Sequence, residues 1–378
     1  MTSSTTSTPG STASTGSTGK PLNDRTKVLL AIVASFLGLV LLAKCGAATD
    51  DGSAGSTGVE TTTAAVPSTT ITATPSLTPS PTPTLAPAAE SADNALAIST
   101  RIIAAQSALA ATPGGAGDAG RAEVYIGPAL TAANAAAKLQ STLSPEALAD
   151  LPLKLDNNPV LAISRGTAYP RAMVVRALKA QTGSPVVLVL IATEGDNYRI
   201  HNQATLLPSG FSGRFDALAK GSPTPNDGAG LAIAPDALMT EYAGWLAFPR
   251  TADAPPASIA NDSFSDQLIA AAKAQAASLR GVGTLTQAHA PVGAQLTIAL
   301  AEDKGALVAT VLERTDTYTE TTANALTPPK EFSVLTGKTV IDKKATLKSF
   351  EFVLFYVPPS GPAQVVAASD QLVAASGS

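Results

Sequence analysis

Val186-Val-Leu-Val-Leu-Ile191 is an uninterrupted run of leucine and β-branched side chains. Such a run has no polar face, so it predicts a central strand that is buried on both sides. Glu194-Gly195-Asp196-Asn197 follows it with the composition of a tight hairpin turn, in which Gly and Asn supply positive φ. We therefore expect this strand to pair with residues 198–207 in an antiparallel sheet.

Further elements precede this hairpin along the chain. Period-two and apolar patterns predict strands at 159–164 and 171–179. Apolar residues at helical spacing predict helices at 95–111, 128–143 and 145–151. Pro113-Gly114-Gly115 ends the first helix, and a proline starts each of the other two. This part of the chain thus reads as helices followed by strands.

The same order returns after a loop at 223–230. Helices are predicted at 235–246 and 264–279, and strands at 285–289, 295–301, 306–318, 338–342, 349–357 and 364–373. Both sets of strands end with an apolar strand, a tight turn, an amphipathic strand and Ser-Gly. We therefore predict an α+β fold of two similar halves, 92–222 and 231–378, each with helices followed by a curved antiparallel sheet.

A charge-free apolar segment lies near the N-terminus, between Lys27 and Lys44. It has no polar stripe, which distinguishes it from a soluble amphipathic helix. As a helix it is roughly 24 Å long, short for a bilayer, although lysine stems at its ends extend its reach. Basic residues precede it and none follows until Arg101. These features predict a transmembrane signal anchor at 27–45 with a cytoplasmic N-terminus and an extracytoplasmic C-terminal domain.

A cleaved signal peptide and a lipoprotein signal share this pattern and remain alternatives. The single cysteine, Cys45, stands where a lipoprotein carries its lipid, but Lys44 before it departs from the small residue that such a site requires. Residues 1–26 read as a disordered cytoplasmic tail and residues 46–91 as a disordered Ser/Thr/Pro-rich stalk, because both have too little apolar surface to fold.

Composition limits the classes of function. The formal net charge of −4 and a charged fraction of 14% provide no basic surface for nucleic acid. One cysteine excludes an intrachain disulfide framework and a cysteine-based zinc cluster. The expected partners are therefore the lipid bilayer, through one helix, and either an envelope protein or an apolar ligand.

Two motifs of the chain match catalytic or nucleotide-binding spacing only superficially. Gly115-Ala-Gly117-Asp-Ala-Gly120 has the GxGxxG spacing, but it follows a predicted helix instead of a strand, so we interpret it as an interhelical loop. Ser212 lacks the second spacer of a nucleophile elbow. Neither motif is assigned a function.

Isolated polar and aromatic residues also have structural explanations. His201 and His289 lie in predicted strands of different halves, with no ligand partner at metal-site spacing, and we expect them to be half-exposed. Asp262 and Asp266 stand at a predicted helix start, where capping explains them. Tyr242 and Trp245 are expected in the core, with the wall of a ligand cavity as the alternative. We assign no catalytic, cofactor-binding or metal-binding residue and no cofactor.

Tyr125-Ile-Gly-Pro-Ala-Leu130 and the hairpin after Val186 carry a resemblance. With the membrane segment and the stalk, the chain resembles uncharacterised exported proteins of actinobacteria with a large C-terminal domain of unknown function. Its helix-then-sheet pattern is similar to the cystatin-like or nuclear-transport-factor-2-like cone. The resemblance implies an envelope location and no known reaction, and many such relatives are lipoproteins.

These observations predict a membrane-anchored extracytoplasmic protein that acts as a non-enzymatic binding or envelope-assembly module. The alternative is an enzyme, a hydrolase or isomerase, that uses the mouth of a cone-shaped cavity, because such folds host enzymes and binders alike. Carboxylate and histidine side chains that converge inside one cavity would favour the enzyme.

Overall fold

The computed structural model describes residues 86–112, 117–211, 213–225, 227–322, 326 and 328–377. The predicted tail, the membrane anchor with Cys45 and the stalk up to residue 85 lie outside these residues. In the part that is described, no helix combines the length and apolar character needed to cross a membrane.

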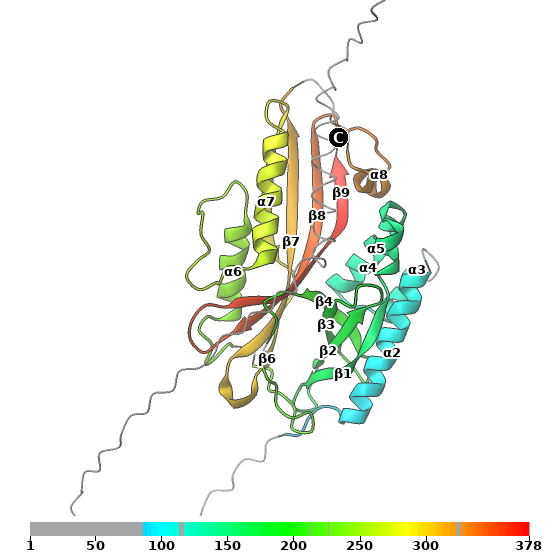
Figure 1. Ribbon diagram of the computed structural model, residues 1–378, viewed down its shortest axis with the longest axis vertical. Coiled ribbons are helices and arrows are strands. Elements are labelled where there is room, and N and C mark those ends of the chain that lie inside the picture. Colours follow the sequence, from blue (N-terminus) through cyan, green and yellow to red (C-terminus); the bar gives the residue numbers. More distant parts are fainter. Residues whose placement is uncertain are drawn as a thin grey trace, which may run out of the picture.

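Helices and strands alternate in blocks along the described chain (Figure 1). The first block comprises α2 (Ala92–Ala111), α3 (Gly117–Ala122), α4 (Pro128–Leu139), η2 (Gln140–Thr142), α5 (Pro145–Ala149), β1 (Leu153–Ile163), β2 (Arg171–Lys179), β3 (Pro185–Ala192) and β4 (Arg199–Leu206). The second comprises α6 (Pro235–Leu246), α7 (Ser263–Ser278), β5 (Gly283–Pro291), β6 (Leu296–Ala299), η3 (Ala301–Asp303), β7 (Ala306–Glu320), α8 (Lys330–Thr336), β8 (Lys344–Val357) and β9 (Gln364–Gly377).

The strands form one antiparallel sheet, which confirms the α+β class. Its order is β1-β2-β3-β4-β9-β8-β7-β5, and β6 pairs with β7 away from this path. The first block thus contributes a meander of consecutive strands, and the second block joins it where β4 pairs with β9. Because the two sets of strands share one sheet, the structure does not establish the division into two similar halves.

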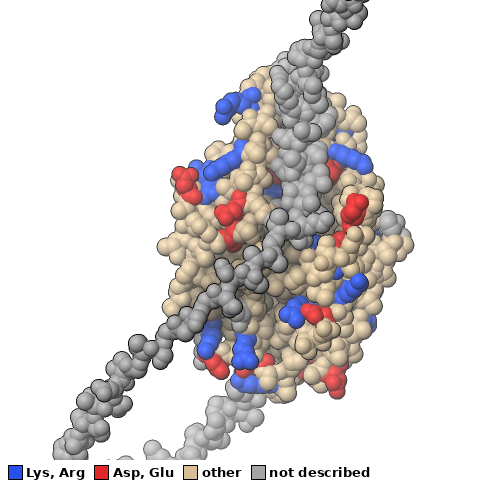
Figure 2. All heavy atoms as spheres, in the orientation of Figure 1, with Lys and Arg blue, Asp and Glu red and all other residues tan. Residues whose placement is uncertain are grey.

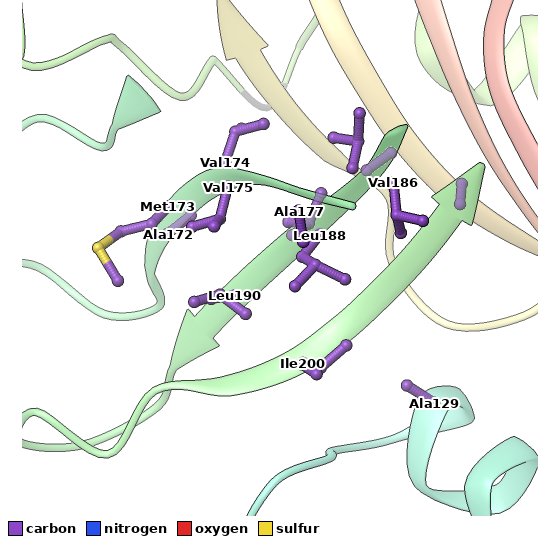
Figure 3. Close-up of a cluster of buried hydrophobic side chains, with 14 of the residues drawn as sticks. Ala129, Ala172, Met173, Val174, Val175, Ala177, Val186, Leu188, Leu190 and Ile200 are labelled. Atoms are coloured by element: carbon purple, nitrogen blue, oxygen red, sulfur yellow. The ribbon is translucent and has the colours of Figure 1, made fainter. Parts of the chain in front are cut away.

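One apolar core lies between α2, α4 and the sheet. β2 and β3 carry fully buried residues on both faces, including Val174, Val175 and Leu188, as the apolar run at 186–191 predicts (Figure 3). Asn202 of β4 is also fully buried, and its Nδ2 donates to the Thr310 carbonyl of β7 over 2.9 Å. The sheet is therefore curved enough for β4 to contact the middle of β7.

A second core lies between the sheet and α6 and α7, which Figure 1 shows on the opposite side of the molecule from α2. Tyr242 packs edge-on against Phe355 of β8, with ring centroids 5.0 Å apart. Asp262 caps α7, because its side chain accepts a hydrogen bond from the Ser265 amide. The capping of this helix and the core position of Tyr242 and Trp245 are thus confirmed.

Two predicted strands need correction, and one helix was not predicted. Residues 338–342 are not a strand: α8 precedes them, and only Ile341 forms an isolated bridge, to Leu326. The helix α8 was not predicted; it ends at Gly337, which adopts φ 72° as the C-cap. β1 begins at Leu153, before Pro159, because bulges allow a proline and polar residues within it.

The described residues before α2 were assigned to the stalk, yet they contact the folded domain. Ala88 bridges to Arg165, and Ser91 caps α2 by accepting a hydrogen bond from the Asn94 amide. The buried Glu90 pairs with Arg171 over 2.9 Å. The ordered domain therefore begins before residue 92.

Candidate functional site

The candidate site lies at a fork in the sheet. β4 and β9 pair at only two positions, Thr205 with Ala368 and Leu206 with Ala367. Beyond Ala368, β9 runs on to Gly377 paired with β8 alone. This stretch of β9 therefore has an open edge inside the sheet, opposite the earlier residues of β4.

A cavity of about 200 Å³ occupies this fork. Three consecutive β9 residues line it, Ser369, Asp370 and Gln371, as expected where a strand presents its edge. Small side chains form much of the opposite wall: Ala110, Ala129, Ala132, Ala133, Ala136 and Ala137. Carboxamides contribute the main polar groups: Gln106, Gln140, Gln203 and Gln371.

The sequence around Tyr125 positions the alanine-rich wall. The Ile126 amide donates to the Ile200 carbonyl of β4, which fixes this segment against the sheet. Gly127 then adopts φ 59°, a left-handed conformation that favours glycine, and Pro128 begins α4. Burial raises the pKa of the Tyr125 hydroxyl to about 12, so this hydroxyl stays protonated at neutral pH.

Two of the carboxamides differ in their hydrogen bonding. Gln106 is used by the fold: its Oε1 accepts from the Leu153 amide and its Nε2 donates to the Leu151 carbonyl. Gln140, only 9% exposed, has a buried Oε1 that no donor in the described part of the chain reaches. A buried acceptor without a partner costs roughly 1–3 kcal/mol, so Gln140 marks a position where a donor is missing.

A network of buried charges lies behind the cavity, on the face of the sheet that α6 and α7 cover. At its centre is Arg314 of β7, which pairs with Asp316 and Glu351 at 3.2 Å each and with Asp370 at 3.0 Å. His289 Nδ1 of β5 lies 3.0 Å from the second carboxylate oxygen of Glu351. The side chains of His289 and Glu351 are both fully buried.

Strand register brings these groups together. His289 stands opposite Arg314 in the β5–β7 ladder, and Glu351 stands opposite Asp370 in the β8–β9 ladder. Arg314 and Asp316 follow Leu312 at intervals of two, so all three side chains share one face of β7. The network is therefore a consequence of one face of the sheet carrying charges instead of apolar residues.

The pKa shifts in the network have identifiable causes. Burial raises the pKa of Asp370 to about 6, partly offset by Arg314. Burial likewise raises the pKa of Asp316. For Glu351, burial alone would raise the pKa, but His289 and Arg314 outweigh it and lower the pKa. Of the network members, Asp370 is the only one that lines the cavity in the described structure.

Comparisons with protein-family models, with curated proteins and with solved structures found no match to this chain. The site is therefore interpreted from its own geometry. Among the described residues, no group of His, Cys, Asp and Glu side chains has the arrangement of a metal site.

The two histidines lie in strands, as predicted, but the environment of His289 differs from the expectation. His289 has a fully buried side chain paired with a carboxylate that is 62 positions away in the sequence, so the prediction of a half-exposed residue was wrong. His201 of β4 is partly buried; burial lowers its pKa, and its Nδ1 has no partner in the described structure. Neither histidine lines the cavity.

The remaining sequence candidates lie apart from the cavity. Gly117 and Gly120 belong to the short helix α3, whereas Gly115 and Ser212 lie outside the described residues. Tyr242 and Trp245 belong to the core under α6 and do not line the cavity. Sequence reasoning missed the network around Arg314, although the alternation of β7 places Arg314 and Asp316 on the same face as Leu312 and Tyr318.

Proposed function

We propose that this protein is a membrane-anchored extracytoplasmic binding module that takes a small ligand into the fork cavity. The supporting observation is a cavity with an alanine-rich wall and a few polar groups, one of which, Gln140 Oε1, has no partner in the described part of the chain. A mostly apolar pocket with few convergent polar groups is typical of small-molecule sites.

The composition of the cavity favours binding over the alternative of a hydrolase or isomerase. Among its described lining residues, Asp370 is the one carboxylate and there is no histidine. Arg121 at its wall is engaged, since its side chain donates to Asn134 and to Asp118 at 2.6 Å each. An acid–base pair at hydrogen-bond reach of a common substrate atom is what general acid–base catalysis requires.

The location of the protein rests on the sequence. The apolar segment at 27–45 and the basic residues before it support a single-pass anchor, with the domain outside the cell membrane. Mass spectrometry of the mature N-terminus tests this: a start at Cys45 would support a lipoprotein, and a start at Ala48 a cleaved signal, and either would overturn the anchor.

The two-halves organisation and the resemblance to cone-like domains are part of the same proposal. Each block begins with helices, although α8 of the second block lies between β7 and β8, and β4 and β9, the last strands of the two blocks, pair with each other. A fork between two such halves provides a place for a ligand where the pairing of the sheet ends.

A variant that fills the cavity tests the binding function. Ala133 of α4 lines the cavity, and Ala133→Trp would occupy it from the helix side. Thr131→Trp, on the exposed face of the same helix, is the matched control. Full-length protein in mild detergent is screened against small fragments by saturation-transfer NMR. We expect to find fragments that bind the wild type and Thr131→Trp but not Ala133→Trp. If the screen finds no such fragment, the proposal is overturned.

A further inference from the structure

Resting on the proposed function, we propose that residues 68–74 of the stalk bind in the fork cavity as an extended strand along the open edge of β9. The segment then acts as a tethered competitor of any small ligand at the same site. Three observations lead to this occupant: the backbone groups that β4 leaves unpaired on β9, the pattern of the stalk sequence, and the length of chain between the two.

The open edge of β9 presents backbone hydrogen-bonding groups to the fork. The Thr205 amide, where the pairing with β4 ends, donates to the Ser369 hydroxyl over 3.0 Å. The Leu372 carbonyl accepts from Nε2 of Gln371 over 3.0 Å, so it points away from the β8 ladder. Backbone groups that face one edge of a strand recur at every second residue, so Asp370 presents its amide and carbonyl to the fork as well. An extended peptide pairs with such an edge through its main chain.

The side chains around this edge suit an uncharged peptide that carries hydroxyl groups. Gln203 and Gln371 line the cavity, and each carboxamide both donates and accepts hydrogen bonds. Peptide groups and the hydroxyls of Ser and Thr also donate and accept, so they match these carboxamides without any requirement for charge. The alanine-rich wall of α4 has no bulky side chain that would keep a main chain away from β9.

The stalk contains a segment with the pattern of a short strand, Ser68-Thr-Thr-Ile-Thr-Ala-Thr74. Most of its residues are β-branched, which favours an extended strand, and none is charged. Pro67 and Pro75 stand on either side of it. Because proline cannot donate to a ladder, pairing with β9 is confined to the residues between the two prolines.

The chain is long enough to bring this segment to the fork. The last residues of the stalk already lie near the start of α2, where the Ala89 amide donates to the Ser164 carbonyl over 2.8 Å. From Ala92, Gln106 at the cavity lies about 21 Å along α2, at a rise of about 1.5 Å per residue. Residues 75–85 would span roughly 34 Å as polyproline II. Such a tether gives an effective concentration of about 1 mM, so even weak binding occupies the fork.

Hydrogen exchange followed by mass spectrometry tests this occupant in the full-length protein in mild detergent. Amides of residues 68–74 should exchange about tenfold more slowly than those of residues 60–66, a stalk segment that is also rich in threonine. This ratio corresponds to a segment that is bound about 90% of the time. Equal exchange of the two segments, after correction for their intrinsic rates, would overturn the inference. Protection that rises with protein concentration would overturn it too, because the segment would then bind a second copy.

Ile71→Pro removes an amide from the middle of the segment and prevents strand pairing without touching the folded domain. We expect residues 68–74 of this variant to exchange as fast as residues 60–66, and residues 369–372 to exchange faster than in the wild type. Thr62→Pro is the matched control, because it places the same residue elsewhere in the stalk and should leave both regions unchanged. Protection of residues 68–74 that survives Ile71→Pro would contradict pairing with β9.

Fragment binding separates this inference from the proposed function. If the segment occupies the fork for about 90% of the time, Ile71→Pro should bind cavity fragments about tenfold more tightly than the wild type. Ala133→Trp, which fills the cavity, should abolish the protection of residues 68–74. If fragments bind equally to the wild type and Ile71→Pro, or protection survives Ala133→Trp, the stalk is not the occupant and the binding function stands. If no fragment binds even Ile71→Pro, the proposed function fails, and only the exchange data decide the inference.

Discussion

Replacing Arg314 with methionine should destabilise the fold more than any surface charge change, because Arg314 pairs with three buried carboxylates at once. Arg314→Met keeps much of the side-chain volume but leaves Asp316 and Asp370 without their cation and Glu351 with His289 alone. Breaking one buried ion pair typically costs about 3–5 kcal/mol of unfolding free energy. We expect a loss of that size, a large fraction of the roughly 5–15 kcal/mol that stabilises a typical domain.

Protonation of the carboxylates that have lost Arg314 limits how much unfolding free energy the variant loses. Without Arg314, burial raises their pKa values further, so they take up protons as the pH falls. A group whose pKa is raised in the folded state contributes stability at low pH and loses it as the pH rises through the folded pKa. The deficit of Arg314→Met relative to the wild type should therefore be largest at pH 7 and smaller at pH 5.

Urea unfolding of the full-length protein in mild detergent measures both effects. The single tryptophan, Trp245, lies in the core beneath α6 and reports the loss of packing by fluorescence. Arg176→Met is the matched control: its side chain is 39% exposed and pairs with Asp156 alone, so it should cost no more than about 1 kcal/mol. A loss below that of the control, or a deficit that grows at pH 5, would refute the reasoning.

Two further perturbations follow from the burial of single side chains. Leu188→Ala in the buried strand β3 should cost about 2–5 kcal/mol in unfolding free energy, because Leu188 is fully buried. The side chain of Leu96 is 43% exposed, so Leu96→Ala should change the unfolding free energy by less than about 0.5 kcal/mol. Equal losses in the two variants would contradict the assignment of β3 to the core of the sheet. Burial raises the pKa of Asp370 to about 6 in the folded protein, against about 3.9 in the unfolded chain. As the pH falls from 7 to 5, the unfolding free energy of the wild type should therefore rise by about 1 kcal/mol relative to that of Asp370→Asn, as measured by urea titration. A constant difference would show that Asp370 does not titrate in this range.

Charge on the molecular surface carries little information about function. On the face shown in Figure 2, acidic and basic residues are interspersed, with no extended area of one sign. The charges around Arg314 are instead buried, where composition and net charge do not reveal them. This explains why the sequence favoured a binding module in general terms but assigned no site residues.

Local features were predictable because neighbouring residues determine them. The apolar run after Pro185 has no polar face, so β3 is central. Asp262 accepts a hydrogen bond from the Ser265 amide at the start of α7. Segment 338–342 was misread, because a short apolar run has no periodicity that distinguishes a strand from a loop.

The sequence by itself determined the α+β class and, except for α8, the order of the main helices and strands, because alternation and capping are properties of residues a few positions apart. Tertiary structure alone decided that β4 pairs with β9, that this pairing stops after two positions, and that a cavity opens there. It also placed Glu351 beside His289 and Asp370 beside Arg314. Strand order and register depend on which edges remain free after the helices pack, and no local pattern records that choice.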